Sequence, residues 1–313
     1  MWSSNLKSRR DLLAWALAGA VVPQVAWARS GVDVLSSETV GVYADLILQL
    51  ERGSRPFGFN LNVTAKVEPS GTVPSLVVTL GTKALREAAQ RSLQSPVWAQ
   101  VPVLAALLPQ SAWRSGAAGL PRGSSAIWLD QPVDRYVELT RQALPQRRRL
   151  GVLLGPTSVG LESVLDRATL ARGLTAVKAN VDAPATDLFP ALQGVLQNCD
   201  MLLALPDPTL YNAESLQNIL IATYRQRVPM LSYTAAHARA GATLALHTPL
   251  EEVAAQLVRA LRQFSTQGSL PVPEGPQGFS VVVNEQVARS LSLDLRGPAE
   301  LQAAVRRAEG RPS

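Results

Sequence analysis

The residue best placed for chemistry is Asp207, in the proline-flanked loop Pro206-Asp207-Pro208. The apolar run Met201 to Leu205 comes directly before this loop and is typical of a strand buried on both faces of a parallel sheet. Because ligands bind to parallel sheets at the loops that follow the strands, Asp207 is a candidate binding residue. The alternative interpretation is a rigid turn without further function, since proline and aspartate are common turn residues.

Small and hydroxyl-bearing residues follow several other apolar runs of the chain in the same way. If these runs are strands of parallel sheets, the loops share one edge, where hydroxyls, glycines and helix N-termini suit hydrogen bonding to a small polar or anionic solute. The sequence therefore predicts a ligand-binding site made by Ser36, Ser37, Gly81, Thr82, Leu108, Pro109, Gly155, Thr157, Ser158, Asp207, Pro208 and Tyr233.

Signatures of catalysis are missing from the sequence. It contains no G-x-S-x-G nucleophile elbow, no H-E-x-x-H zinc motif and no G-x-G-x-x-G fingerprint. His237 and His247 stand ten positions apart with no third ligand, so they do not predict a metal site. We therefore predict a binding protein with no catalytic residue, no metal and no cofactor, rather than an enzyme. The alternative, a degenerate α/β enzyme, requires a nucleophile or metal site that the motifs do not show.

Composition supports a folded protein with large cores. Of the 313 residues, 47% are hydrophobic and 17% charged, and a chain of this length fits two domains of about 150 residues each. The net charge is +6, of which Lys7, Arg9, Arg10 and Asp11 contribute +2, which leaves +4 for the remainder. So mild and scattered a charge argues against a nucleic-acid partner. With Cys199 as its one cysteine, the chain forms no internal disulfide.

Residues 1–28 are typical of a secretory signal. The basic region Lys7 to Arg10 precedes an apolar stretch from Leu12 to Val25, which is short for a bilayer span. Ala26-Trp27-Ala28 is a small-residue cleavage site. We therefore expect export to the periplasm, cleavage after Ala28 and no stable membrane insertion afterwards. A membrane anchor that is never cut is the alternative.

The route of export stays open. Ser8-Arg9-Arg10-Asp11-Leu12-Leu13 resembles the twin-arginine motif, with Leu12 where phenylalanine is usual. Paired arginines before an apolar stretch also occur in ordinary signals, so the sequence does not choose between the two routes.

Strand-like runs and helical periodicities alternate twice, before and after about Asp130. Residues 110–123 are rich in Gly, Ser and Arg and are interpreted as a surface loop. Helix caps are expected at Thr82, Asp130, Asn212, Asn284 and a capping box, Thr248-Pro249-Leu250-Glu251. Strands are expected at 32–35, 57–64, 75–80, 101–107, 124–129, 150–154, 175–179, 201–205, 228–232, 242–246 and 279–283. This alternation implies an α/β fold of two Rossmann-like lobes with parallel sheets and a cleft between them.

Four short motifs, in this order and spacing, resemble one group of ABC-transporter substrate-binding proteins: GTKA at 81–84, GVLL at 151–154, PDPT at 206–209 and VNEQVA at 283–288. The group includes tryptophan- and phenylalanine-type amino-acid binders, and the chain resembles most its proteobacterial branch of unassigned ligand. The resemblance covers nearly all of residues 32–296.

The resemblance implies a type I periplasmic-binding-protein fold, in which three hinge crossings join the lobes. We place the crossings near Asp130, His247 and residues 271–278. Lobe 1 would then contain residues 29–130 and 248–277, and lobe 2 residues 131–247 and 278–313.

The resemblance also implies a function. A small polar solute, such as an amino acid or related compound, would be trapped by hinge closure and delivered to an ABC permease by a protein that we expect to be a monomer. Gly81 and Thr82 would bind from the first lobe, and residues 155–158 with Asp207 from the second, where Asp207 would accept a hydrogen bond from a ligand ammonium group. A periplasmic ligand sensor or regulatory subunit with the same fold and no dedicated transporter is the alternative.

Two loops depart from the family pattern. Ser232-Tyr233-Thr234 stands where an acidic residue is usual, and Leu108-Pro109-Gln110 where an Asp-Pro pair is common. The loss of two carboxylates weakens the case for a cationic amine as the ligand.

Overall fold

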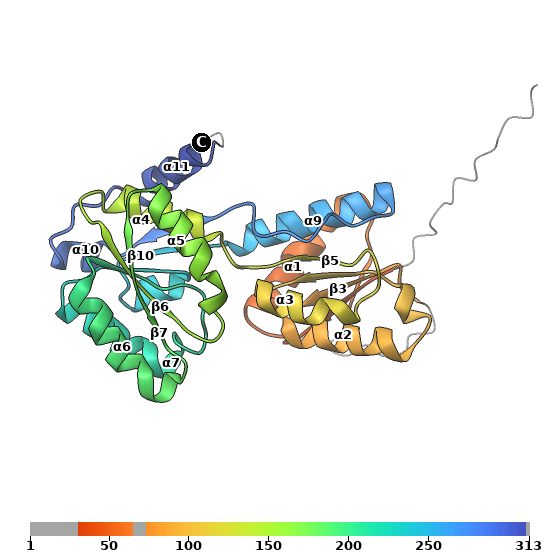
Figure 1. Cartoon of the computed structure of the whole chain (residues 1–313). Helices are drawn as coiled ribbons and strands as arrows, with labels where there is room; N and C mark the ends of the chain where they lie inside the picture. The colour runs from red at the N-terminus through yellow and green to blue at the C-terminus, as the bar shows by residue number, and fades with distance from the viewer. Residues whose placement is uncertain (1–30, 65–72, 311–313) are drawn as a thin grey trace, which may run out of the picture.

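The computed structural model describes residues 31–64 and 73–310. They form two lobes, each a sheet with helices on both faces, that lie side by side and are joined by extended segments (Figure 1). The predicted signal, residues 1–28, lies outside the described residues. Within the described ranges, none of the helices combines the length and apolar character needed to cross a bilayer.

Lobe 1 is built on a parallel sheet in the order β2-β1-β3-β4-β5. The central strands are runs of Val, Leu and Ala that are buried on both faces, as parallel strands between two helix layers require. The strands are β1 (Val32–Ser36), β2 (Leu61–Thr64), β3 (Leu76–Leu80), β4 (Val103–Ala106) and β5 (Ser125–Ile127).

Helices cover both faces of this sheet. One face packs against α1 (Val42–Ser54) and α9 (Leu250–Gln267), and the other against α2 (Thr82–Gln94) and α3 (Gln110–Gly116) (Figure 1). Short 3-10 turns occur at Arg55–Phe57, Trp98–Gln100 and Ala117–Gly119. Because α9 follows the second lobe in sequence, lobe 1 is completed only when the chain returns to it.

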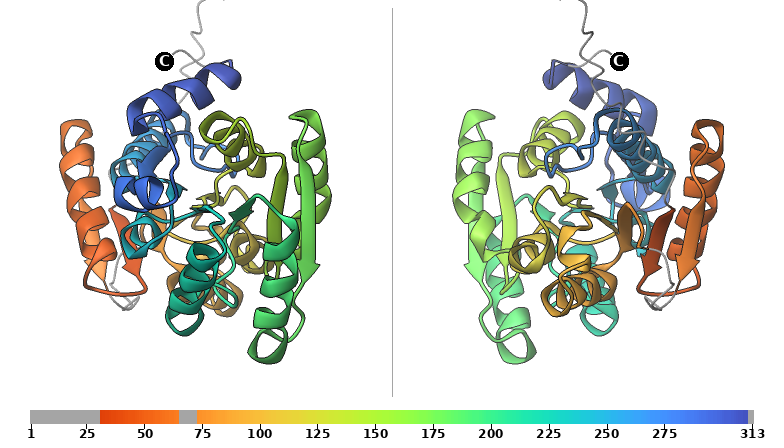
Figure 2. Two further views of the ribbon diagram at one scale, coloured as in Figure 1. Left: turned by 90° about the vertical axis from the view of Figure 1, so that its left-hand side faces the viewer. Right: turned by 90° about the vertical axis from the view of Figure 1, so that its right-hand side faces the viewer.

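Lobe 2 is built on the sheet β11-β10-β9-β8-β6-β7, in which β11 alone is antiparallel to its neighbour. The two end-on views of Figure 2 show helices flanking the strands on both sides. The strands are β6 (Arg149–Leu154), β7 (Thr175–Asn180), β8 (Met201–Leu203), β9 (Met230–Ser232), β10 (Leu244–His247) and β11 (Ser280–Val283).

Two separate apolar clusters hold these helices to the sheet. One face packs against α4 (Val133–Ala143), α5 (Glu162–Ala171) and α11 (Pro298–Ala308), and the other against α6 (Pro184–Asn198) and α7 (Ala213–Arg225). The remaining elements are short: α8 (Ala235–Ala240), α10 (Glu285–Ser290) and a 3-10 turn at Val159–Leu161.

The chain passes between the two sheets three times: between β5 and α4, between β10 and α9, and between α9 and β11. The first and third crossings run side by side, since Ile127 forms a parallel bridge with Glu274 and the Trp128 N–H donates to the Glu274 carbonyl at 3.3 Å. The predicted fold class, two α/β lobes joined by three hinge crossings, is confirmed.

The prediction of a loop at 110–123 is wrong, because this stretch forms α3 and a 3-10 turn. Trp113 is 9% exposed and belongs to the core under α2, so one buried aromatic side chain anchors a helix that composition alone does not indicate. Gly116 allows the close approach: a Cβ there would lie 3.0 Å from Leu85 Cδ2.

Three predicted caps are also wrong. Asp130 does not cap α4, which begins at Val133; its Oδ2 instead accepts from the Gln110 N–H at the start of α3, at 2.6 Å. The Thr248 side chain makes no cap bond to α9. Thr82 is the first residue of α2, and the hydroxyl of Ser37 accepts from the Ala84 N–H at 3.0 Å instead.

The two asparagine caps are confirmed. The side chain of Asn212 accepts from the backbone N–H groups of Glu214 and Ser215, and that of Asn284 accepts from Val287. These caps bind within their own helices. The caps that the sequence did not predict, Ser37 on α2 and Asp130 on α3, lie in loops that are distant in sequence from the helices they cap.

The three crossings meet at the side chain of Gln131. Its Nε2 donates to Thr248 Oγ1 at 2.7 Å, in the second crossing, and to the carbonyl of Gly278 at 2.9 Å, in the third. Its Oε1 accepts from Arg135. One buried amide therefore ties all three crossings together.

Arg135 extends this network to the C-terminal helix, which lies beside α4 in both views of Figure 2. The guanidinium donates to both carboxylate oxygens of Glu309, at 2.6 and 3.1 Å, and stacks 4.6 Å from the ring centre of Phe279. We call Gln131, Arg135, Thr248, Gly278 and Glu309 the hinge cluster.

We predict that Glu309→Ala lowers the free energy of unfolding by about 3 kcal/mol, because it leaves a buried charge without its carboxylate. The side chain of Arg135 is 3% exposed, against 22% for Glu309. Urea denaturation measures the change. The control is Glu285→Ala, which removes an exposed pair with Arg289 at 3.6 Å and should cost less than about 0.5 kcal/mol. Equal losses of unfolding free energy in the two variants would contradict the proposed contribution of the hinge cluster to stability.

Candidate functional site

A pocket of about 390 Å³ opens between the lobes beside the hinge, and we call it the interlobe pocket. Its walls come from the segments that follow β4, β5, β8, β9 and β10, which are the carboxyl ends of strands of both sheets, and from the first turns of α4. The lining residues are Pro109, Leu129, Asp130, Tyr136, Pro206, Pro208, Tyr233, Thr234, Ala235, His247 and Thr248.

Three of the predicted site residues, Pro109, Pro208 and Tyr233, line this pocket. The other nine end or follow strands at the same edges but are not among its lining residues: Ser36, Ser37, Gly81, Thr82, Leu108, Gly155, Thr157, Ser158 and Asp207. Whether these nine contact a ligand stays a prediction.

Asp207 is fully buried, and both of its carboxylate oxygens accept hydrogen bonds from the protein itself. Oδ2 accepts from the Ser158 hydroxyl at 2.8 Å and from the N–H groups of Ser158 and Thr157 at 3.0 and 3.2 Å. Oδ1 accepts from the Thr209 hydroxyl at 2.6 Å and its N–H at 3.0 Å. In this structure Asp207 therefore positions the 155–158 loop.

Gly155 lets this contact form. A Cβ on Gly155 would lie 2.7 Å from Asp207 Oδ2 and 2.7 Å from Leu210 Cγ, so a larger residue would displace the carboxylate. The Gly155 N–H also donates to the Ser158 hydroxyl at 2.9 Å, which fixes the turn from within. The loop after β6 is thus held by contacts on both sides.

A similar arrangement holds the loops after β1 and β3. Gly81 has φ of 88°, a left-handed conformation that favours glycine, and a Cβ there would lie 2.6 Å from the hydroxyl oxygen of Ser37. That hydroxyl caps α2 through Ala84. The neighbouring Ser36 is buried, and its hydroxyl donates to the Glu38 carbonyl at 2.6 Å.

The loop after β4 brings Pro109 to the pocket. Leu107 has φ of 53°, which is unusual for a bulky residue, and Leu108 is fully buried with its carbonyl accepting from the Leu129 N–H at 3.0 Å. The loops after β4 and β5 are therefore joined where both reach the pocket.

Tyr233 forms an aromatic wall of the pocket and is held on two sides. Its ring meets those of Tyr211 and His237 edge-on, with centres 6.2 and 5.0 Å apart. His237 is fixed in turn, because its Nδ1 lies 2.6 Å from the buried hydroxyl of Ser232. Burial raises the pKa of Tyr233 to about 12, so its hydroxyl stays protonated at neutral pH.

The lining of the pocket includes one acidic side chain, that of Asp130. Burial raises the pKa of Asp130 above the usual value, and the hydrogen bond from Gln110 opposes this. Burial lowers the pKa of His247, which keeps the ring neutral, and burial together with nearby Asp130 raises that of the Tyr136 hydroxyl. Across residues 31–64 and 73–310, no cluster of three or more His, Cys, Asp or Glu side chains is arranged to hold a metal ion.

Sequence reasoning missed most of the lining residues. The sequence predicts a helix cap at Asp130 and crossings near Asp130 and His247, but it predicts neither residue as part of the binding site. Asp130 follows β5 and His247 is the last residue of β10, so their place at the end of a parallel strand was a usable signal. Tyr136 lies one turn into α4 and follows no strand, so no pattern singled it out. Also missed were Leu129, Thr234, Ala235 and Thr248, whereas Pro206 belongs to the predicted loop Pro206-Asp207-Pro208.

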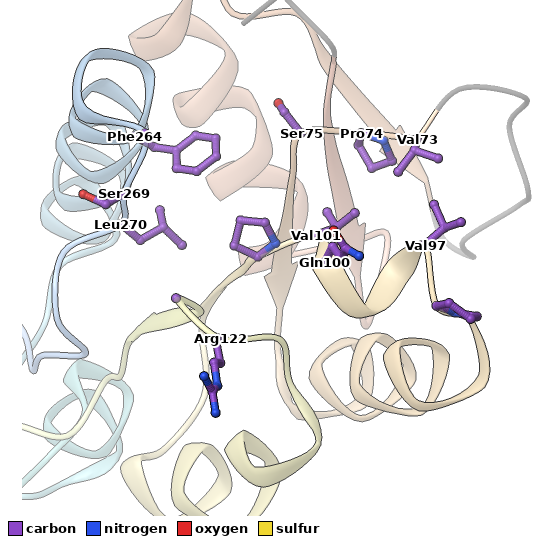
Figure 3. Close-up of a pocket in the computed structure, with 14 residues that line it drawn as sticks. Val73, Pro74, Ser75, Val97, Gln100, Val101, Arg122, Phe264, Ser269 and Leu270 are labelled. Atoms are coloured by element: carbon purple, nitrogen blue, oxygen red, sulfur yellow. The ribbon is translucent and has the colours of Figure 1, made fainter. Parts of the chain in front are cut away.

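A second, larger cavity of about 730 Å³ lies in lobe 1 (Figure 3). Phe264 and Leu270 stand on one side of it and Val73 and Val97 on the other, with Arg122 below. Ser75, Val101 and Arg122 each come before a strand, so this cavity lies at the amino ends of the sheet, opposite the edge where α/β sheets bind ligands. The interlobe pocket is therefore the better candidate.

Comparison with solved structures identifies the fold. A substrate-binding protein with adhesive properties from Clostridium difficile, in its ligand-free, open form, superposes with a TM-score of 0.67 at 14% identity, over 86% of this chain and 96% of that one. An ABC domain from Streptococcus pneumonia in complex with L-Trp gives 0.57 at 14% identity, over 85% and 96%. A periplasmic ribose ABC transporter protein from Conexibacter woesei gives 0.52 at 10% identity, over 87% and 97%.

The chain therefore has the fold of ABC-transporter solute-binding proteins, the type I periplasmic-binding fold, as the resemblance in sequence implied. At identities this low the likeness establishes the fold alone. No protein-family model matches the chain, and no curated protein sequence matches it.

We predict that Asp207→Asn lowers the free energy of unfolding by about 3 kcal/mol, because an amide replaces a buried acceptor of charge-assisted hydrogen bonds. Asp182→Asn, at an exposed turn, is the control and should cost less than about 0.5 kcal/mol. Urea denaturation of both variants at pH 7 measures this, and equal stability of the two would rule out the positioning role.

The effect should depend on pH. Burial works to raise the pKa of Asp207, but the hydrogen bonds from Thr209, Ser158 and Thr157 outweigh it and hold the pKa below its usual range. The ionised carboxylate therefore adds stability above the unfolded-state pKa of about 3.9, which is lost as the pH falls through the lower folded-state pKa. The difference between the native chain and Asp207→Asn should shrink between pH 5 and pH 2 by roughly the linkage contribution of this one group.

Proposed function

We propose that this protein is a solute-binding protein that captures a small solute in the interlobe pocket and delivers it to an ABC importer. The observation that carries the proposal is the position of the pocket. It lies at the hinge between two lobes, and strand ends of both sheets line it. A solute bound there would contact both lobes at once, so its binding energy favours their closed arrangement.

The architecture suits such a closure. Each lobe has its own apolar clusters, so a rotation about the three crossings leaves both cores intact. The predicted site residues outside the pocket, among them Ser37, Thr82 and Thr157, follow strands at the same edges and are the groups that closure would bring toward a ligand.

The remaining parts of the proposal come from the sequence. The signal at 1–28 supports export to the periplasm with cleavage after Ala28, and the fold supports an ABC permease as the partner of a monomeric binding protein. The walls of the pocket suit binding rather than catalysis, since proline, leucine and alanine side chains supply much of the surface. An amino acid or related compound is the ligand that the sequence resemblance favours.

The direct test is a ligand screen on purified residues 29–313. Thermal melts against amino acids, sugars, organic acids and amines should identify a compound that raises the melting temperature, since ligand at 100 times its dissociation constant stabilises by about 2.7 kcal/mol. The same compound should reduce the radius of gyration in small-angle X-ray scattering. A screen in which nothing shifts either quantity would contradict the proposal.

For any compound that the screen identifies, we predict that Tyr233→Ala raises the dissociation constant at least about tenfold, because an immobilised aromatic wall of the pocket is lost. Isothermal titration calorimetry measures it. The control is Tyr224→Ala, since Tyr224 is 51% exposed on α7 and lies outside the interlobe pocket. Equal affinities of the two variants would place the ligand elsewhere.

A further inference from the structure

The charges around the interlobe pocket bear on its ligand, if the proposed function holds. Among the lining residues, which all lie within 31–64 and 73–310, Asp130 is the one acidic residue, and none is lysine or arginine. His247 is kept neutral by its burial. A backbone hydrogen bond at Thr248 opposes the lowering of the His247 pKa, and Arg239 and Glu251, which do not line the pocket, act on it in opposite directions.

The Asp130 carboxylate is fixed in place. Oδ2 accepts from the Gln110 N–H at 2.6 Å, which holds the side chain at the end of β5 while it lines the pocket. The one acidic group among the lining residues is thus held in a fixed position. A ligand that covers it without matching it would bury an unpaired carboxylate, which is costly.

Apart from the hydroxyls of Thr234 and Thr248, the rest of the lining is apolar or aromatic. Pro109, Leu129, Pro206 and Pro208 present hydrocarbon, and Tyr136 and Tyr233 add two rings with protonated hydroxyls. Aromatic rings attract cations, and a pocket of about 390 Å³ is within the size range of small-molecule sites. A ligand carboxylate would meet Asp130 with no cationic side chain of the lining to offset the repulsion.

We propose that the interlobe pocket takes a small organic amine in its ammonium form, whose apolar body lies against Tyr136 and Tyr233 and whose positive charge faces Asp130. This differs from the expectation drawn from the loops after β4 and β9, whose missing carboxylates argued against an amine. The carboxylate is present, but it follows β5 instead.

Three probes of similar shape and different charge test the inference on the protein purified after export: 2-phenylethylamine, 2-phenylethanol and 3-phenylpropionate. In calorimetric titrations at pH 7 the amine should bind at least tenfold more tightly than the alcohol, and the carboxylate should show no binding. Tighter binding of the carboxylate, equal binding of all three, or no binding of the amine would overturn the inference.

The matched variants are Asp130→Asn and Asp134→Asn. Asparagine at position 130 keeps an oxygen for the Gln110 N–H, so α3 stays capped while the charge is lost. We expect a tenfold or greater loss of affinity for the amine and little change for the alcohol. Asp134 is 57% exposed and pairs with Arg172 outside the pocket, so its variant should bind as the native protein does.

Melting curves of both variants verify that they fold, and an unchanged amine affinity in folded Asp130→Asn would overturn the inference. Its failure is distinct from failure of the proposed function. If the protein closes on an acid or a sugar in the wider screen, the proposed function holds and the inference of an amine ligand is wrong. If it closes on no compound, both the proposed function and the amine inference are wrong.

Discussion

The molecule depends on one constraint: three chain segments that belong to no sheet core must be held together between two lobes. The amide of Gln131 meets it by donating to the second and third crossings and accepting from Arg135, which joins the C-terminal helix to the same point. Apart from the bridge between Ile127 and Glu274, polar groups in these segments lie outside the ladders of the two sheets, so they need partners of this kind. The interlobe pocket lies beside the cluster, since Leu129, Asp130, His247 and Thr248 belong to the crossings. The place that joins the lobes is also the place that would receive a solute.

A second regularity concerns the polar residues at strand ends. Ser37 follows β1 and caps the helix after its neighbour β3, while Asp130 follows β5 and caps the helix after β4. Asp207 follows β8 and holds the loop after β6, again its neighbour in the sheet. In each case a side chain satisfies N–H groups that the start of a helix or turn leaves without intrahelical partners. These loops therefore reinforce one another in pairs along the edge that faces the cleft.

This regularity explains what the sequence could and could not predict. Buried parallel strands are recognised in a sequence as apolar runs, so the predicted bounds of β3, β6 and β8 agree with the structure within a few residues. The asparagine caps are predicted correctly because the N–H groups that they bind lie two or three positions away. The bond from Gln110 to Asp130 joins residues 20 positions apart, and that from Ala84 to Ser37 joins residues 47 apart, so spacing gave no signal for either. Tyr136 was missed for a related reason: it reaches the pocket from a helix that otherwise packs into a core.

Asp207 holds a loop in place, whereas the lining residues form the surface that a ligand would meet, and this separation of roles affects how the ligand specificity of such a protein can evolve. Leu129, Pro206, Thr234 and Ala235 form the walls of the pocket, whereas the carboxylate that secures the neighbouring loop points into the protein. Exchange of Leu129, Pro206 or Ala235 would therefore leave the loop anchors untouched, whereas Thr234, which caps α8, and Asp130, which caps α3, serve both roles. The ligand specificity of such a protein would then change through single substitutions, because a new side chain in the pocket wall need not loosen the loops that hold the pocket in place.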